Sequence, residues 1–159
     1  MKIVSLLPSA TELVGELGME KMLCAISHEC DTPLTVMDLP RATGSNLPTN
    51  LSQKEINKSV SIALQDGESL YTVDSVLLNE IKPDLILTQG LCDVCAVSSN
   101  NIQASLRGTQ CILPEKTKII SLNGRDFQGI RNDFMMLADA VGQIEKAQSI
   151  YSEYKNRWD

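Results

Sequence analysis

The stretch that decides the fold is Pro-Asp-Leu-Ile-Leu-Thr-Gln-Gly-Leu-Cys-Asp-Val-Cys-Ala-Val (83–97). A proline is not tolerated inside a helix, and the residues behind it, 84–88, form a short and mostly apolar run. Such a run is typical of a strand buried on both faces of a parallel sheet. The strand is expected to end at Gln89-Gly90, before a loop with Cys92 and Cys95. Ligands of open α/β sheets bind beyond the carboxyl ends of the strands, so this loop is the first candidate for function.

Shorter apolar runs on both sides of this stretch predict further strands. Runs at 3–7 and 23–27 precede it, and runs at 110–113 and 118–122 follow it. The segment 34–51 lacks such a run and is predicted to be a loop. Strands that alternate with helices form parallel sheets with right-handed crossovers. The predicted fold class is therefore α/β: a single lobe with a mostly parallel sheet of four to five strands flanked by helices.

Capping residues set the expected bounds of the helices. Ser9-Ala-Thr-Glu12 and Ser52-Gln-Lys-Glu55 have the spacing of capping boxes, in which the serine and the glutamate each bond a free backbone amide. Gly18 is expected to end the first helix, Asp126 to begin a later one, and Gly142 to interrupt it. That later helix has one apolar stripe, which is predicted to lie in the core: Phe127, Ile130, Phe134, Leu137 and Val141.

Composition and charge exclude several classes of protein. The 159 residues are 43% apolar and 21% charged, which is ordinary for one globular domain. The formal charge of −6, with scattered Lys and Arg, argues against nucleic acid as a partner. No apolar run has the length of a membrane helix, and the run at 3–7 is too short for a signal peptide, so the chain as given is expected to be cytoplasmic. Five cysteines are an odd number, without the density of a disulfide scaffold.

Three loops are expected to meet at one edge of the sheet, because the carboxyl ends of parallel strands lie together. They follow the strands predicted at 3–7, 23–27 and 84–88, and the first also begins a helix, where free amides favour an anion or a polar acceptor. Neither Gly-x-Gly-x-x-Gly nor a Walker A sequence is present, so no nucleotide site is expected. The candidate ligand residues in the three loops are Ser9, Ala10, Thr11, His28, Glu29, Cys30, Gln89, Gly90, Leu91, Cys92, Val94 and Cys95.

The same loops resemble those of a known family. Their sequences are Leu-Leu-Pro-Ser-Ala-Thr-Glu (6–12), Ser-His-Glu-Cys-Asp-Thr-Pro (27–33) and Thr-Gln-Gly-Leu-Cys-Asp-Val-Cys-Ala-Val-Ser (88–98). Together they resemble the N-terminal lobe of ABC-transporter substrate-binding proteins of the vitamin B12 and iron-siderophore class, and most closely the cobalamin-binding branch. In this class two α/β lobes are joined by one long helix, and the ligand lies between them. The resemblance covers essentially the whole chain.

The resemblance implies an organisation and a function. Residues 1–142 are expected to form the N-terminal ligand-binding lobe, and 143–159 the start of the connecting helix, with a second lobe missing. The implied function is capture of a corrinoid such as cobalamin, or of a related metal chelate, for an ABC importer at a periplasmic or cell-surface location. Exposed carboxylates are expected to dock on the permease, with Glu55, Asp66 and Glu68 as candidates.

The cysteine loop leaves alternatives open. Cys92 and Cys95 form a Cys-x-x-Cys pair, which is typical of a dithiol redox centre. Together with His28 and Cys30 they also offer four ligands suited to zinc. In a third interpretation the thiols are half-buried and shape the ligand cleft. His28, which is the only histidine, is also a candidate axial ligand to cobalt or haem iron.

The sequence predicts a binding protein rather than an enzyme. No nucleophile is paired with a base, because one histidine without a serine or cysteine partner at a defined spacing does not make a triad. No catalytic cofactor is therefore expected. On the last helix, Ile144, Tyr151 and Trp158 are expected to form an exposed apolar stripe, through which this fragment is predicted to form a homodimer.

Overall fold

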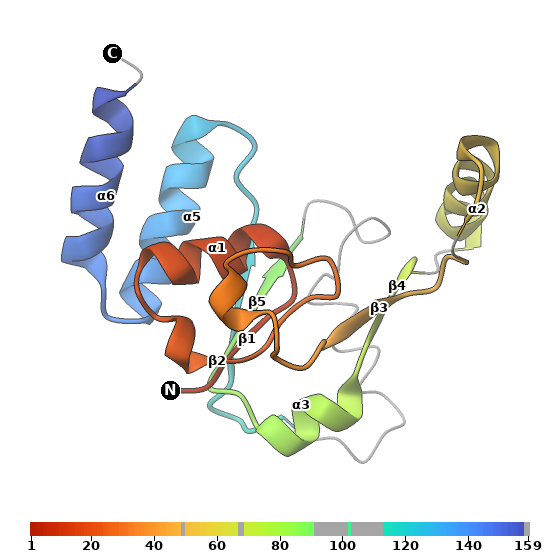
Figure 1. Cartoon of the computed structure of the whole chain (residues 1–159), viewed down its shortest axis with the longest axis horizontal. Coiled ribbons are helices and arrows are strands. Elements are labelled where there is room, and N and C mark those ends of the chain that lie inside the picture. Colours follow the sequence, from red (N-terminus) through yellow and green to blue (C-terminus); the bar gives the residue numbers. More distant parts are fainter. Residues whose placement is uncertain (49, 67–68, 91–101, 103–112, 158–159) are drawn as a thin grey trace.

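A four-stranded sheet lies at the centre of the computed structural model, which describes residues 1–48, 50–66, 69–90, 102 and 113–157 (Figure 1). All four strands are parallel, which confirms the predicted α/β fold class. In spatial order the strands are β2 (Leu23–Ala25), β1 (Ile3–Ser5), β5 (Leu85–Gln89) and β6 (Lys118–Leu122).

Apolar side chains cover both faces of this sheet. Leu85 and Leu87 of β5 point into one hydrophobic cluster, and Ile86 between them points into another; all three are at most 2% exposed. The continuous apolar run in the sequence follows from this burial on two sides. Residues of three helices complete the first cluster: α1 (Pro8–Glu16), α5 (Phe127–Ala140) and α6 (Ile144–Asn156). The second cluster includes α3 (Ser75–Ile81).

A two-stranded sheet forms an arm beside the main sheet. Strands β3 (Thr43–Ser45) and β4 (Tyr71–Val73) pair antiparallel, and α2 (Gln53–Asp66) extends from them away from the main sheet (Figure 1). The prediction of a loop over 34–51 is therefore wrong, because the segment contains β3 and a short 3-10 helix at Leu34–Val36. The three residues of β3, Thr-Gly-Ser, are too few to give a periodic signal, and their partner strand is distant in the sequence.

Most of the predicted helix caps are present. Ser52 N donates to Glu55 Oε2 at 2.8 Å in the capping box of α2, and the bonds from the Ser52 side chain and backbone hold the pKa of Glu55 below its usual value. The Asp126 carboxylate accepts the backbone N–H three residues on at 2.7 Å and so begins α5. Gly18 and Gly142 follow the ends of α1 and α5 with φ of +68° and +70°, a left-handed conformation that glycine adopts without strain.

The predicted cap of the first helix is wrong. Helix α1 begins at Pro8, its N-cap is Leu7, and no side chain caps it. The capping box expected at 9–12 begins two residues after the observed N-cap. Proline is favoured at the first helical position because its missing N–H needs no partner there.

The apolar stripe of α5 lies in the core only in part. Phe134, Leu137 and Val141 are buried, as predicted, but Phe127 is 71% and Ile130 is 53% exposed. The prediction is wrong for these first two members. Helical periodicity specifies the direction in which a side chain points, whereas the neighbouring elements decide whether anything covers it.

Several predictions fall partly or wholly outside the described residues. The strand predicted at 110–113 is one of them, and Trp158 is another. Within the terminal stripe, Ile144 is 40% exposed and Tyr151 is half-buried. Helix α6 begins at Ile144, close to the predicted boundary, but its role as a connector stays a prediction. None of the helices that the structure describes combines the length and hydropathy needed to cross a bilayer.

Asp84 connects the starts of β1 and β5 to the segment before β6. Its Oδ2 accepts from Lys2 N at 2.9 Å, and its Oδ1 lies 2.9 Å from Lys116 Nζ. The Lys116 ammonium first, and the Lys2 amide second, hold the pKa of Asp84 below its ordinary value of 3.8. Asp84 therefore stabilises the fold in its ionised form.

This gives a prediction about pH. A lowered folded-state pKa means that the stabilisation is present above the unfolded-state pKa and is lost as pH falls through the folded-state pKa. We expect Asp84→Asn to lower the free energy of unfolding at pH 7, and to flatten its decline between about pH 5 and pH 2. Urea denaturation over this range measures both effects, with the exposed Asp38→Asn as control. Identical pH profiles for Asp84→Asn and the unmodified chain would contradict the assignment.

A second prediction concerns the core. Leu137 is 0% exposed on α5, whereas the neighbouring Met136 is 40% exposed. Leu137→Ala should lower the free energy of unfolding by about 2–5 kcal/mol, because it removes apolar contacts and leaves a cavity. Met136→Ala should cost roughly 1 kcal/mol or less. Urea denaturation of both variants measures their free energies of unfolding. Equal decreases in the two variants would show that α5 is not packed as described.

Candidate ligand-binding site

A cavity of about 250 Å³ lies at the carboxyl edge of the main sheet. We refer to it as the edge cavity. Two of the predicted ligand residues, Ser9 and Gln89, meet there because β1 and β5 are parallel neighbours. The residues that line the edge cavity are Leu7, Ser9, Leu13, Gln89, Leu122, Gly124, Ile130 and Asp133.

The polar groups of the edge cavity are few and mostly neutral. Ser9 offers a hydroxyl and Gln89 an amide, each of which donates and accepts. Among the described residues of the lining, Asp133 is the one with a charge, and its Oδ2 accepts from Gly124 N at 2.6 Å. That bond fixes the loop after β6. An apolar wall with a few polar groups suits a ligand that has an apolar body and hydrogen-bonding side groups.

Two further predicted residues, Ala10 and Thr11, lie beneath the cavity rather than in it. Both are fully buried. Thr11 Oγ1 lies 2.9 Å from Ser5 Oγ and 3.2 Å from Cys30 Sγ, and Thr11 N donates to the Leu7 carbonyl at 3.3 Å. These contacts hold the first turn of α1 against β1 and the loop after β2. The Thr11 amide is thus engaged within the protein.

His28 faces the arm. Its backbone N donates to Thr43 Oγ1 at 3.0 Å, and its Nδ1 lies 2.7 Å from the same oxygen. Its ring centroid is 5.6 Å from that of Tyr71. Nε2 lies 3.2 Å from Glu29 Oε1, but it is buried and makes no aligned hydrogen bond to any described residue. Both ring nitrogens therefore face protein atoms, and a metal-binding role for His28 stays a prediction.

Arg41 shapes the loop that contains His28 and Cys30, and the sequence analysis missed it. Its guanidinium donates to the carbonyl oxygens of Ser27 at 3.0 Å and of Cys30 at 3.1 Å. These bonds satisfy two carbonyls that follow β2 and tie them to the segment before β3. No local motif marks this role of Arg41, because these two acceptors lie more than ten positions away.

Asn123 fixes the end of β5 and was also missed. Its Oδ1 accepts from Gly90 N at 2.9 Å and from Ser121 Oγ at 3.1 Å. A Cβ at position 90 would lie only 2.8 Å from Ser121 Oγ and 2.9 Å from Asn123 Oδ1, so glycine is needed there for close approach. The Gln89 backbone is thereby held beside the loop after β6.

The remaining predicted site residues, Leu91, Cys92, Val94 and Cys95, lie outside the described residues. Cys30 is a buried thiol, and Glu29 is exposed. Among the described residues, no group of three or more His, Cys, Asp or Glu side chains is placed to hold a metal ion. Because Cys92 and Cys95 are not covered by that statement, the zinc and redox interpretations stay predictions.

The chain matches solved structures of binding proteins. A periplasmic haem-binding protein from Pseudomonas aeruginosa superimposes with a TM-score of 0.66 at 14% identity, over 98% of this chain and 43% of that chain. An ABC transporter substrate-binding protein from Listeria monocytogenes EGD-e superimposes with a TM-score of 0.62 at 15% identity, over 98% of this chain and 45% of that chain. A periplasmic vitamin B12-binding protein of Vibrio cholerae superimposes with a TM-score of 0.60 at 20% identity, over 99% of this chain and 48% of that chain. No protein-family model matches the chain, and no curated protein matches its sequence.

Identities this low show the fold alone. The fold is that of the N-terminal lobe of a substrate-binding protein, and the chain spans less than half the length of the proteins it matches. The neighbours include haem binders as well as a B12 binder, so the cobalamin branch is one of several to which the chain is similar. They give no support for the predicted homodimer.

The contacts of Asn123 give a prediction about the edge of the site. Asn123→Ala removes the acceptor of the Gly90 amide, which costs about 1 kcal/mol of local stability. We expect hydrogen exchange at the Gly90 amide to become roughly fivefold faster. Asn79→Ala, on the exposed side of α3, serves as the control and should leave that amide unchanged. Unchanged exchange in Asn123→Ala would show that this side chain does not hold the end of β5.

Proposed function

We propose that this chain is the ligand-capturing N-terminal lobe of a substrate-binding protein that serves an ABC importer. The edge cavity carries the proposal, because it joins Ser9 and Gln89 at the carboxyl edge of a parallel sheet. The same fold occurs in periplasmic haem- and vitamin B12-binding proteins, which supports a binding role without a catalytic step. The proposed location is accordingly periplasmic or cell-surface.

A corrinoid is the ligand that we propose for the edge cavity, with haem and iron chelates as the competing ligands. Corrins carry amide groups around a large apolar ring, and the Ser9 hydroxyl and Gln89 amide can exchange hydrogen bonds with such groups. Asp133 supports the same choice, since its carboxylate would repel the carboxylates of a porphyrin that entered the cavity.

A second lobe is part of the proposal. Binding proteins that close two lobes over a ligand bury it from both sides, whereas this chain offers one side. We therefore expect one lobe to bind its ligand only in about the high-micromolar to millimolar range, several kcal/mol weaker than the two-lobed protein.

Permease docking through carboxylates of the arm remains part of the proposal. Asp66 is exposed at the end of α2 and can meet a cationic partner. The carboxylate of Glu55 already accepts bonds from Ser52, so it is less suited to docking. Glu68 lies outside the described residues.

The ligand assignment is tested by titrating the chain with cyanocobalamin, cobinamide, haem and a ferric siderophore, followed by NMR chemical shifts. We expect the corrinoids to shift the resonances of Ser9, Gln89 and Leu122. Gln89→Ala removes one hydrogen bond, worth about 0.5–1.5 kcal/mol, and should weaken corrinoid binding by roughly two- to tenfold. Gln53→Ala, on α2 of the arm, is the matched control and should leave binding unchanged.

The outcomes of this titration distinguish an error in the proposed ligand from an error in the proposed substrate-binding role. Binding of haem or the siderophore alone, at the same resonances, would replace the corrinoid and keep the substrate-binding role. If none of the four compounds shifts resonances of the edge cavity, the proposed role of this cavity is wrong.

A further inference from the structure

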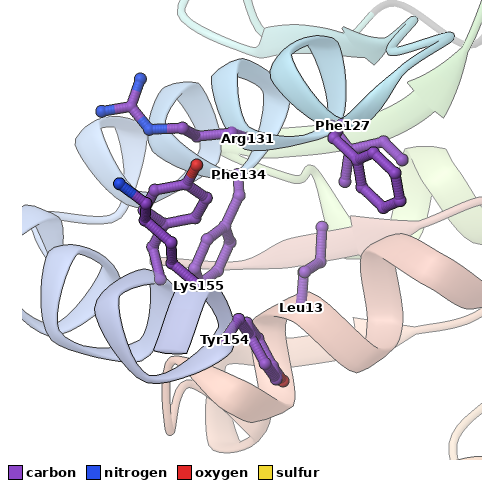
Figure 2. Close-up of a pocket in the computed structure, with 8 residues that line it drawn as sticks. Leu13, Phe127, Arg131, Phe134, Tyr154 and Lys155 are labelled. Carbon is purple, nitrogen blue, oxygen red and sulfur yellow. The ribbon is translucent and has the colours of Figure 1, made fainter. Parts of the chain in front are cut away.

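A second cavity is lined by residues of α1, α5 and α6 (Figure 2). We refer to it as the aromatic cavity. Its volume is about 320 Å³, which is at the lower end of the range for small-molecule sites. Leu13 and Ile130 line it on one side and the edge cavity on the other. The described residues that line it are Leu13, Phe127, Ile130, Arg131, Phe134, Tyr151, Tyr154 and Lys155.

The walls of the aromatic cavity are large apolar side chains that remain accessible. Phe134 forms the buried floor at 4% exposure. Around it Phe127, Ile130 and Tyr154 are 71%, 53% and 37% exposed. Contiguous exposed side chains of this kind mark binding surfaces, since a folded chain otherwise gains by covering them.

Two cationic side chains, Arg131 and Lys155, lie at one end of the aromatic cavity. Figure 2 shows the nitrogen ends of Arg131 and Lys155 on the same side, with Phe127 on the opposite side. The Arg131 guanidinium lies 4.9 Å from the centroid of the Tyr151 ring, which holds it over the cavity wall. Neither cation forms an ion pair with any of the described residues.

The charged side chains of the aromatic cavity are positive, whereas the chain as a whole is negative. The protein has a formal charge of −6, yet the charged residues among the described lining of the aromatic cavity are Arg131 and Lys155, both of them cations. Arg157 adds a third cation, 4.9 Å from the centroid of the Tyr154 ring. A carboxylate placed here would gain charge-assisted hydrogen bonds next to a low-dielectric wall, where such bonds are strong.

We propose that the aromatic cavity binds a small amphipathic carboxylate. Its apolar body lies over Phe134 between Phe127 and Tyr154, and its carboxylate lies between Arg131 and Lys155. The volume suits a single aliphatic chain of medium length or a small ring system. This ligand differs from the chelate proposed for the edge cavity, where Asp133 is the charged residue.

The test uses the chain itself and decanoate as the probe, below its micelle concentration, followed by calorimetry. We expect saturable binding of decanoate and at least tenfold weaker binding of decylammonium, because the two cations repel a second cation. The double variant Arg131→Met with Lys155→Met should weaken decanoate binding at least tenfold. Lys146→Met, on the same helix α6 but outside the cavity, should change it less than twofold.

A second pair of variants tests the apolar wall. Tyr154→Ala should weaken decanoate binding several-fold, whereas Ile144→Ala should not. Both residues are on α6 and about equally exposed, at 37% and 40%, but Tyr154 alone lines the cavity. Circular dichroism confirms that each variant is folded.

Three results would overturn the proposal: equal affinity for decanoate and decylammonium, full affinity in the double variant, or no binding of decanoate. None of them bears on the edge cavity, because the four charge and wall variants leave its lining intact.

Discussion

The ladder of backbone hydrogen bonds between β5 and β6 is the constraint on which the other features depend. Five consecutive residue pairs, from Leu85–Lys118 to Gln89–Leu122, join these strands, and β1 pairs with β5 on the other side. Because all the pairings within the main sheet are parallel, each of its strands ends at the same edge. Gln89, the loop after β6 and the start of α1 therefore converge there, and the edge cavity is a consequence of strand direction.

Residues of helix α5 line two cavities of opposite electrostatic character. Asp133 faces the edge cavity and Arg131 lines the aromatic cavity, although only one residue lies between them. Two positions along a helix rotate a side chain by about 200°, so neighbours in sequence reach different sides. Leu13 and Ile130 form the apolar wall that the cavities share. A ligand with polar neutral groups and a ligand with a carboxylate are thus separated by the orientation of one helix.

Much of the main sheet could be predicted from the sequence, and the arm could not. The runs at 3–7, 23–27 and 118–122 each contain a strand of the sheet, and the run at 84–88 covers all but the last residue of β5, because burial on both faces favours a continuous apolar segment. The arm pairs Thr43–Ser45 with Tyr71–Val73, two strands of three residues each. Segments that short have no detectable period, and only their mutual pairing makes them strands.

For the site, the sequence by itself indicated that the loops after β1 and β5 lie at one edge, since alternating strands and helices form a parallel sheet, although the third loop expected there, after β2, contributes no described residue to the edge cavity. It thereby placed Ser9 and Gln89 together, and it determined the caps at Glu55 and Asp126, whose partners lie three residues away. Only the tertiary structure decided that Ala10 and Thr11 are buried and that Arg41 and Asn123 hold the loops. The tertiary structure also left Phe127 exposed in the lining of the aromatic cavity. The physical reason is the distance in sequence between the interacting residues. A hydrogen bond between residues a few positions apart leaves a pattern in the sequence, whereas burial and long-range hydrogen bonds depend on which elements become neighbours.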